Sequence, residues 1–312
     1  MDKLKRSLDI SNMVIEDGEE SGNGASGKAG ETLCCASCGI AEVDDIKLTT
    51  CDANYKLVRY CSDACQRDHR PQHKEECKKR VAELRDELLF VQPESNHLGD
   101  CPICFLPLAI DGSKRVMMSC CSKQNPSLKR KCPFCRHPVP TTNAESDANR
   151  MKRVEVNDPV AMRQMGIRRY SEGDYGSAFE YLTKAAQMGD VEAHDYLSLM
   201  YWKGTGVEKD EEKGNYHAEE AAIAGHPEAR FNLGSIEWNN GSKERAVKHF
   251  VIAANLGDDK SVEILKMGHL RGLVSKEDFA AALRAHQAAV DATKSPGRDA
   301  AAAEQARRRN AK

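Results

Sequence analysis

All thirteen cysteines of this 312-residue chain lie between Cys34 and Cys135, and none follows. Many of them form pairs separated by two or three residues, a spacing at which one turn of chain can supply two of the four ligands of a zinc ion. In a reducing compartment such pairs favour metal ligation over a disulfide framework, and the odd number of cysteines favours it too. The chain therefore joins two regions with different chemistry.

Composition and charge restrict the location and the partners. The N-terminal segment has no apolar stretch followed by a small-residue cleavage site, and no apolar run approaches the ~20 residues of a membrane helix. We expect an intracellular protein, cytoplasmic or nuclear, without a membrane partner. The formal net charge of -2 gives no strongly basic surface, so nucleic acid is not an expected partner either.

The first cysteine cluster lies between residues 35 and 77. It contains C-x-x-C, an isolated cysteine, the segment Arg-Tyr-Cys-Ser followed by another cysteine, and a final histidine and cysteine. This order resembles a MYND-type zinc finger, which implies two interleaved zinc sites. The resemblance implies that the first site is formed by Cys35, Cys38, Cys61 and Cys65.

The second site implied by the resemblance uses Cys51, His73 and Cys77. The family has a further cysteine three residues after Cys51, where this chain has Asn54. Cys34 and His69 are the alternatives that could complete the site. Three ligands and a water would be typical of a catalytic zinc, but the sequence supplies no general base such as the glutamate of H-E-x-x-H. We therefore interpret this as a structural site.

A second cluster begins with C-P-I-C at Cys101 and Cys104 and ends with C-P-F-C at Cys132 and Cys135. These pairs resemble the outer pairs of a RING-type zinc finger. A complete RING has eight ligands, whereas the stretch between Cys121 and Cys132 contains no cysteine or histidine. Two interpretations remain. The outer pairs close one zinc site, which has the better ligand count, or Cys120 or Cys121 joins the last pair with His137 in reserve.

The shortened centre of this cluster bears on whether the chain is an enzyme. A RING engages its ubiquitin-conjugating enzyme through both zinc loops, so a shortened RING-like segment weakens a ubiquitin-ligase interpretation. No histidine with an orienting partner can be recognised for a nucleophilic cysteine. We favour a non-enzyme, and the alternative is a RING-type ubiquitin–protein ligase whose repeats select the substrate.

The C-terminal part contains one motif three times, in which Ala-Ala precedes Gly189, Gly225 and Gly257, spaced 36 and 32 residues apart. This is the period of a two-helix solenoid unit. The alanines allow close helix packing, and the glycine supplies a left-handed residue that ends a helix. With Gly-Thr-Gly at 204–206, the segment resembles Sel-one-like repeats, relatives of the tetratricopeptide repeat. Asp158-Pro159 predicts the first helix start, and Ser275 with Asp278 predicts the start of a capping helix.

The predicted architecture is a set of small zinc-stabilised modules followed by an all-α helical-repeat solenoid. We expect a disordered tail at 1–30, the MYND-like finger at 31–79, a connecting helix at 80–98, the RING-like knuckle at 99–140, a hinge-like linker at 141–157, the repeats with their capping helix at 158–292 and a flexible tail at 293–312. Counting ligand sets predicts roughly two or three Zn²⁺ ions. The predicted function is a protein-interaction adaptor or scaffold. Its expected partners are other proteins or peptides, with a ubiquitin-conjugating enzyme under the alternative.

Overall fold

The computed structural model describes residues 49–50, 59–60, 82–111, 116–121, 123–125 and 131–300, with single positions at 64, 67, 79, 303 and 307. The chain divides into two compact units, Met1–Leu88 and Leu89–Lys312. Within the described ranges, no helix combines the length and the apolar character needed to cross a bilayer.

The described part of the first unit consists of a two-stranded sheet and helical residues. Strand β1 (Thr49–Thr50) pairs antiparallel with β2 (Arg59–Tyr60), with Thr49 opposite Tyr60. Residues 82–88 are helical and fall within the predicted connecting helix. The predicted ligands of the finger lie outside the described residues, so their roles stay predictions: Cys35, Cys38, Cys51, Cys61, Cys65, His73 and Cys77.

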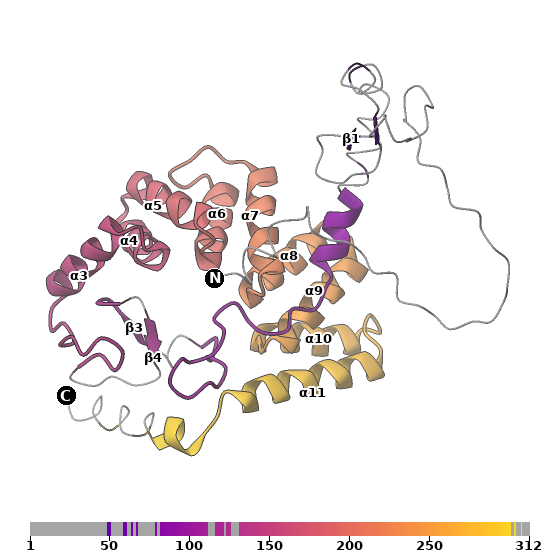
Figure 1. Cartoon of the computed structure of the whole chain (residues 1–312). Coiled ribbons are helices and arrows are strands. Elements are labelled where there is room, and N and C mark those ends of the chain that lie inside the picture. The colour runs from indigo at the N-terminus through magenta and orange to yellow at the C-terminus, as the bar shows by residue number, and fades with distance from the viewer. Residues whose placement is uncertain are drawn as a thin grey trace, which may run out of the picture. The chain divides into compact units, whose positions relative to one another are not determined.

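The second unit is mainly helical, and its helices follow one another in a curved stack (Figure 1). Their bounds are α3 Asn143–Glu155, α4 Pro159–Glu172, α5 Tyr175–Gln187, α6 Val191–Lys203, α7 Glu211–Ile223, α8 Pro227–Asn239, α9 Lys243–Asn255, α10 Asp259–Leu270 and α11 Lys276–Ala292. Each helix packs against the next, most closely within the pairs α4–α5, α6–α7 and α8–α9. The predicted solenoid of two-helix units is therefore confirmed.

Short polar side chains cap the start of most of these helices. The carboxylate of Asp158 accepts hydrogen bonds from two N–H groups in the first turn of α4, and Pro159 is the first helical residue. Ser275 caps α11, where its hydroxyl accepts from the N–H of Asp278 at 3.0 Å. Both helix starts that the sequence predicted are confirmed.

The repeated Ala-Ala-x-x-Gly motif forms the end of one helix and the turn to the next. Its glycines have φ values in the left-handed region, +84° at Gly189, +82° at Gly225 and +98° at Gly257. Side chains disfavour this conformation, so glycine ends the helix at low cost. The alanines of the motif are all buried, at most 7% exposed, as expected for close packing between helices.

Two other glycines are required because a neighbouring side chain leaves no room for a Cβ, and not because the backbone has a positive φ. A Cβ on Gly166 of α4 would lie 2.8 Å from Leu182, and a Cβ on Gly234 of α8 would lie 2.8 Å from Phe250. Leu182 and Phe250 belong to buried clusters of the repeats. These glycines let α5 and α9 pack directly on the backbones of α4 and α8.

A helix occupies the segment for which composition predicts a hinge. Helix α3 begins after Thr142, whose side chain accepts from the N–H of Glu145 at 3.2 Å. Val154 packs against the cluster of the first repeats, and Arg168 of α4 pairs with Asp147. The hinge prediction is wrong for residues 143–155, because polar residues that are typical of a linker here cap the helix and form ion pairs.

The segment after α11 also differs from the predicted flexible tail. Residues 296–300 are helical, and the hydroxyl of Ser295 accepts from the N–H of Arg298 at 3.2 Å. The prediction of a flexible tail rests on its proline, glycine and alanine residues and its basic end. Its start is nevertheless ordered, because Arg298 also contacts the second cysteine module.

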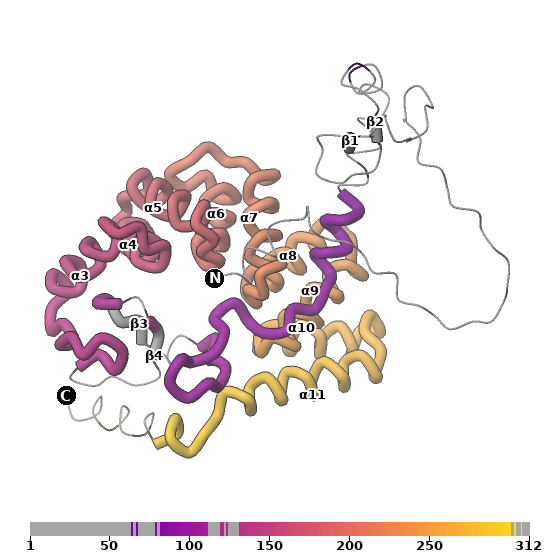
Figure 2. The backbone as a smooth tube through the Cα atoms, viewed as in Figure 1, coloured from indigo at the N-terminus to yellow at the C-terminus, as the bar shows by residue number. Residues whose placement is uncertain are grey.

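Residues 89–99, called the strap below, run alongside α8 and α9 (Figure 2). The N–H of His97 donates to the carbonyl of Gly225 at 3.0 Å, and Asn255 donates to the Gln92 side chain at 2.9 Å. A Cβ on Gly225 would lie 2.7 Å from the carbonyl oxygen of Ser95. The strap therefore packs closely against the turn between α7 and α8, which contains Gly225.

Candidate metal centre and interaction surfaces

The second cysteine module contains two turns with the same geometry. In each turn the N–H and the C=O of the first cysteine, Cys101 or Cys132, form hydrogen bonds within the turn at 2.8 to 3.0 Å. The residue after the second cysteine has a positive φ, +53° at Phe105 and +63° at Arg136. Such a conformation is uncommon outside glycine, so the hydrogen bonds of the turn must stabilise it. Both C-P-x-C pairs therefore form tight knuckles.

Four cysteines of the module converge. The sulfur atoms of Cys120, Cys121, Cys132 and Cys135 all lie within 4.8 Å of one another. The distance from Cys120 to Cys135 is 3.3 Å, and that from Cys121 to Cys132 is 3.6 Å. Tetrahedral zinc with sulfur ligands at about 2.3 Å places the sulfurs about 3.8 Å apart, whereas a disulfide needs about 2.05 Å. The spacing fits a zinc ion better than disulfides.

A short hairpin supplies two of these four cysteines. Strand β3 (Val116–Met118) pairs antiparallel with β4 (Lys123–Asn125), and Cys120 and Cys121 lie in the turn between them. The knuckle that begins at Cys132 supplies the other two. The ammonium of Lys123 lies 5.3 Å from the ring centre of Phe134, which helps to hold the knuckle against the hairpin.

The four thiols differ in their acidity. Burial raises the pKa of Cys120, and it raises the pKa of Cys121 to about 11. Burial also opposes ionisation of Cys132, but the N–H groups of Cys135 and Phe134 donate to its sulfur and lower its pKa to about 7. Adjacent thiolates repel one another, so all four can be ionised together only around a cation. The donor set therefore fits zinc, which binds thiolates.

The sequence favoured one zinc site formed by Cys101, Cys104, Cys132 and Cys135, and the structure groups these cysteines differently. Cys132 and Cys135 lie with both Cys120 and Cys121, while Cys101 and Cys104 are not in this group. One signal could have found the arrangement, because Cys120 and Cys121 are the only cysteine or histidine residues between Cys104 and Cys132. Spacing alone did not indicate that adjacent cysteines act together.

An ion-pair network joins the strap to the first repeats. Arg163 of α4 pairs with Asp190 at 2.9 Å and with Glu192, both near the start of α6. Glu192 also lies 3.3 Å from the ring of His97 in the strap, and the His97 ring is 4.2 Å from that of His226. Because most of these side chains are buried, the network gives the strap a defined position on the repeats.

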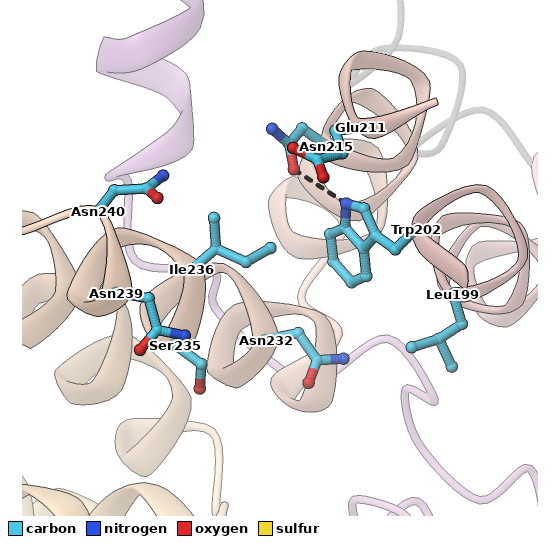
Figure 3. A pocket seen from close by; sticks show the side chains of 9 residues that line it. All are labelled: Leu199, Trp202, Glu211, Asn215, Asn232, Ser235, Ile236, Asn239 and Asn240. Atoms are coloured by element: carbon cyan, nitrogen blue, oxygen red, sulfur yellow. Dashed lines mark hydrogen bonds between the residues drawn. The ribbon is translucent and has the colours of Figure 1, made fainter. Parts of the chain in front are cut away.

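A polar pocket of about 440 Å³ lies between α6, α7 and α8 (Figure 3). The indole N–H of Trp202 donates to Asn215 at 3.0 Å, and Asn232, Asn239 and further polar side chains line the same pocket. A carboxamide both donates and accepts hydrogen bonds, as a peptide group does. The pocket therefore offers an aromatic ring and amide groups suited to a peptide chain.

Comparison with known families shows which domains the chain contains. Residues 35–77 match the family model of the MYND finger, and residues 159–190, 191–226 and 227–258 each match the Sel1 repeat. The protein is therefore a zinc-finger protein with helical repeats, and both of these sequence resemblances are confirmed. The RING-like resemblance of the second cysteine module stays a prediction.

Individual relatives share only part of the chain. Chitin synthase regulatory factor 4 of Schizosaccharomyces pombe is 29% identical over 136 residues, which make up 41% of this chain and 21% of that protein. A Sel1 repeat protein from Oxalobacter formigenes is 24% identical with a TM-score of 0.43, over 48% of this chain and 65% of that one. The protein c5321, a protective antigen of uropathogenic Escherichia coli with an SLR fold, is 22% identical with a TM-score of 0.40, over 54% of this chain and 43% of that one.

Proposed function

We propose that this protein is a zinc-dependent adaptor that binds one set of protein partners through its MYND finger and another through its repeats. The observation that carries the proposal is the presence of a MYND finger and three Sel1 repeats in one chain. A MYND finger implies zinc binding, and Sel1 repeats generally mediate contacts between proteins. Cysteines stay reduced and available as zinc ligands in a reducing compartment, so we place the protein inside the cell.

The surface of the repeats supports this proposal. The pocket beside Trp202 combines a ring with carboxamides from α7 and α8 (Figure 3). Asn232 on α8 is half-buried, lines this pocket and is not a member of the buried cluster against which Trp202 packs. We propose this pocket as a contact point for an extended peptide of a partner. The fission-yeast relative is named as a regulatory factor, which is the kind of role that an adaptor performs.

The test asks whether the full-length protein bridges two sets of partners. Cys61→Ser should disable the finger while the repeats stay helical by circular dichroism, because metal binding and folding are linked in such small domains. Asn232→Arg should fill the pocket with a long side chain. Lys266→Ala, at an exposed position of α10, is the matched control.

We expect cross-linking in cell extract to identify partners lost only with Cys61→Ser and others lost only with Asn232→Arg. Sequential purification of the wild-type protein should then recover both sets in one assembly. If every captured protein binds both variants as well as it binds the control, the adaptor proposal is refuted.

The two knuckles also keep a ubiquitin–protein ligase as the alternative function. It can be tested by mixing the protein with a conjugating enzyme that carries ubiquitin as a thioester. We expect the thioester to discharge at the rate seen without the protein. A several-fold faster discharge of the thioester that depends on Cys132 would favour the ligase function over the adaptor function.

A further inference from the structure

The two knuckles of the second cysteine module have the same backbone geometry but different surroundings. Cys132 and Cys135 lie beside two further cysteines whose sulfur atoms complete a group of four. The other knuckle, Cys101 and Cys104, has no such pair among the described residues. Each knuckle buries its first cysteine and exposes its second. One turn thus meets the ligand requirement of zinc, and the other needs two more ligands.

The remaining potential ligands of the module, Asp100, Asp111 and His137, form no metal-binding group with Cys101 and Cys104 among the described residues. Between Asp111 and Lys131 the only cysteine, histidine or acidic residues are Cys120 and Cys121, and both already belong to the group of four. Structural zinc sites almost always have four protein ligands. A pair of thiolates alone does not meet that requirement, so the Cys101–Cys104 knuckle must be stabilised in another way.

Arg298, which follows α11, contacts this knuckle directly. Its guanidinium donates to the sulfur of Cys104 at 3.2 Å and to the carbonyl of Leu106 at 2.9 Å. It also donates to the carbonyl of Pro107 at 2.6 Å and to that of Thr293, at the end of α11, at 2.7 Å. One cation therefore joins the sulfur, the knuckle backbone and the end of the solenoid.

We propose that the second cysteine module binds a single zinc ion through Cys120, Cys121, Cys132 and Cys135, and that Arg298 in place of a metal ion closes the Cys101–Cys104 knuckle. The guanidinium supplies the positive charge beside Cys104, and its planar set of donors satisfies carbonyls that a metal would leave free. This inference rests on the zinc-binding part of the proposed function. It replaces the predicted site of Cys101, Cys104, Cys132 and Cys135.

One consequence concerns the relation between the module and the repeats. A knuckle closed by zinc would be complete within its own segment of chain. A knuckle closed by Arg298 depends on a residue 194 positions away from Cys104 in the sequence. The RING-like module and the end of α11 should therefore behave as one folded unit.

Cysteine labelling of the wild-type protein tests the proposal without any substitution. Cys104 and Cys135 are the exposed cysteines of the two knuckles, so they form a matched pair. We expect iodoacetamide to label Cys104 several-fold faster than Cys135, because zinc protects Cys135. After treatment with a strong chelator, labelling of Cys135 should accelerate several-fold, while that of Cys104 should change little. Equal protection of both cysteines before chelation would overturn the proposal.

Zinc content per chain, measured by native mass spectrometry, supplies the second test. Cys135→Ser should remove one zinc ion, whereas Cys104→Ser and Arg298→Met should remove none. Arg298→Met should also increase hydrogen exchange at the amides of residues 101–108, and Arg284→Met on α11 is the control. Loss of zinc with Cys104→Ser would overturn the proposal. So would unchanged exchange with Arg298→Met. Neither readout involves a partner, so the adaptor proposal can fail or stand separately.

Discussion

Arg230 connects the strap to the repeats. It is fully buried on α8, and its guanidinium donates to the carbonyls of Leu89 and Val91 in the strap. Leu89 is the last helical residue of the stretch 82–89, so its carbonyl has no acceptor role within a helix. Removing Arg230 should therefore loosen the strap and destabilise the repeats together.

The size of the effect can be worked out from two opposing contributions. Burial lowers the pKa of Arg230 to about 10, which corresponds to about 3 kcal/mol against the charged form. Hydrogen bonds from a charged donor contribute about 1.5–3 kcal/mol each, so the two contribute less than about 6 kcal/mol, because the bond to Val91 is 3.5 Å long and therefore weak. Arg230→Met keeps most of the volume and should cost at most about 3 kcal/mol. Arg230→Ala adds a cavity and should cost about 3–5 kcal/mol.

Urea unfolding followed by tryptophan fluorescence can measure these differences. The two tryptophans, Trp202 on α6 and Trp238 on α8, both report on the repeats. Hydrogen exchange at the His97 amide, which donates to Gly225, reports on the strap. Arg284→Met, at an exposed position of α11, should change the free energy of unfolding by less than about 0.5 kcal/mol. The reasoning is refuted if Arg230→Ala resembles this control in both measurements.

Three further predictions concern packing, pH and metal. Gly234→Ala, which would bring a methyl group 2.8 Å from Phe250, should lower the free energy of unfolding by about 1–3 kcal/mol, whereas Gly176→Ala in open space should not lower it; equal urea midpoints would contradict this. Burial, with Arg230 and Arg245 adding repulsion, lowers the pKa of His249 to about 3. Its stabilising contribution is present above pH 6.5 and is lost as the pH falls, by about 2 kcal/mol at pH 5, so His249→Phe should lose less stability than the wild type between pH 7 and pH 5. Chelation of zinc should leave the helical circular dichroism of the repeats almost unchanged, and a large loss would show that the repeats need the metal.

The repeats could be predicted because the residues that start and end each helix are recognisable in the local sequence. The left-handed turn at Gly225 requires glycine, and Asp158 caps the helix that it precedes. These signals act over a few residues, so the sequence displays them directly. The segment 143–155 also has a local signal for a helix, but we interpreted the segment as a hinge. Thr142 and Glu145 form a local capping pair, but an Asn/Ser/Asp-rich composition conceals it.

The grouping of the cysteines could not be predicted in the same way. Both C-P-x-C pairs have the same spacing and form knuckles with the same hydrogen-bond pattern, so the spacing does not distinguish Cys101 from Cys132. The difference arises from which chain segment lies opposite each knuckle. The turn between β3 and β4 brings Cys120 and Cys121 to one knuckle, and the segment after α11 brings Arg298 to the other.

Arg230 and Arg298 share a property that explains why sequence reasoning missed both. Each donates to backbone carbonyls of a distant segment, 141 residues away for Arg230 and Leu89, and 192 residues away for Arg298 and Leu106. Every residue has a carbonyl group, so the accepting segment carries no side-chain signature of the contact. It follows that the two arginines should be more sensitive to substitution than the side chains of the residues that they hold. Val91, which is 57% exposed and contributes only its carbonyl, should accept alanine with little change in strap protection, whereas Arg230 should not.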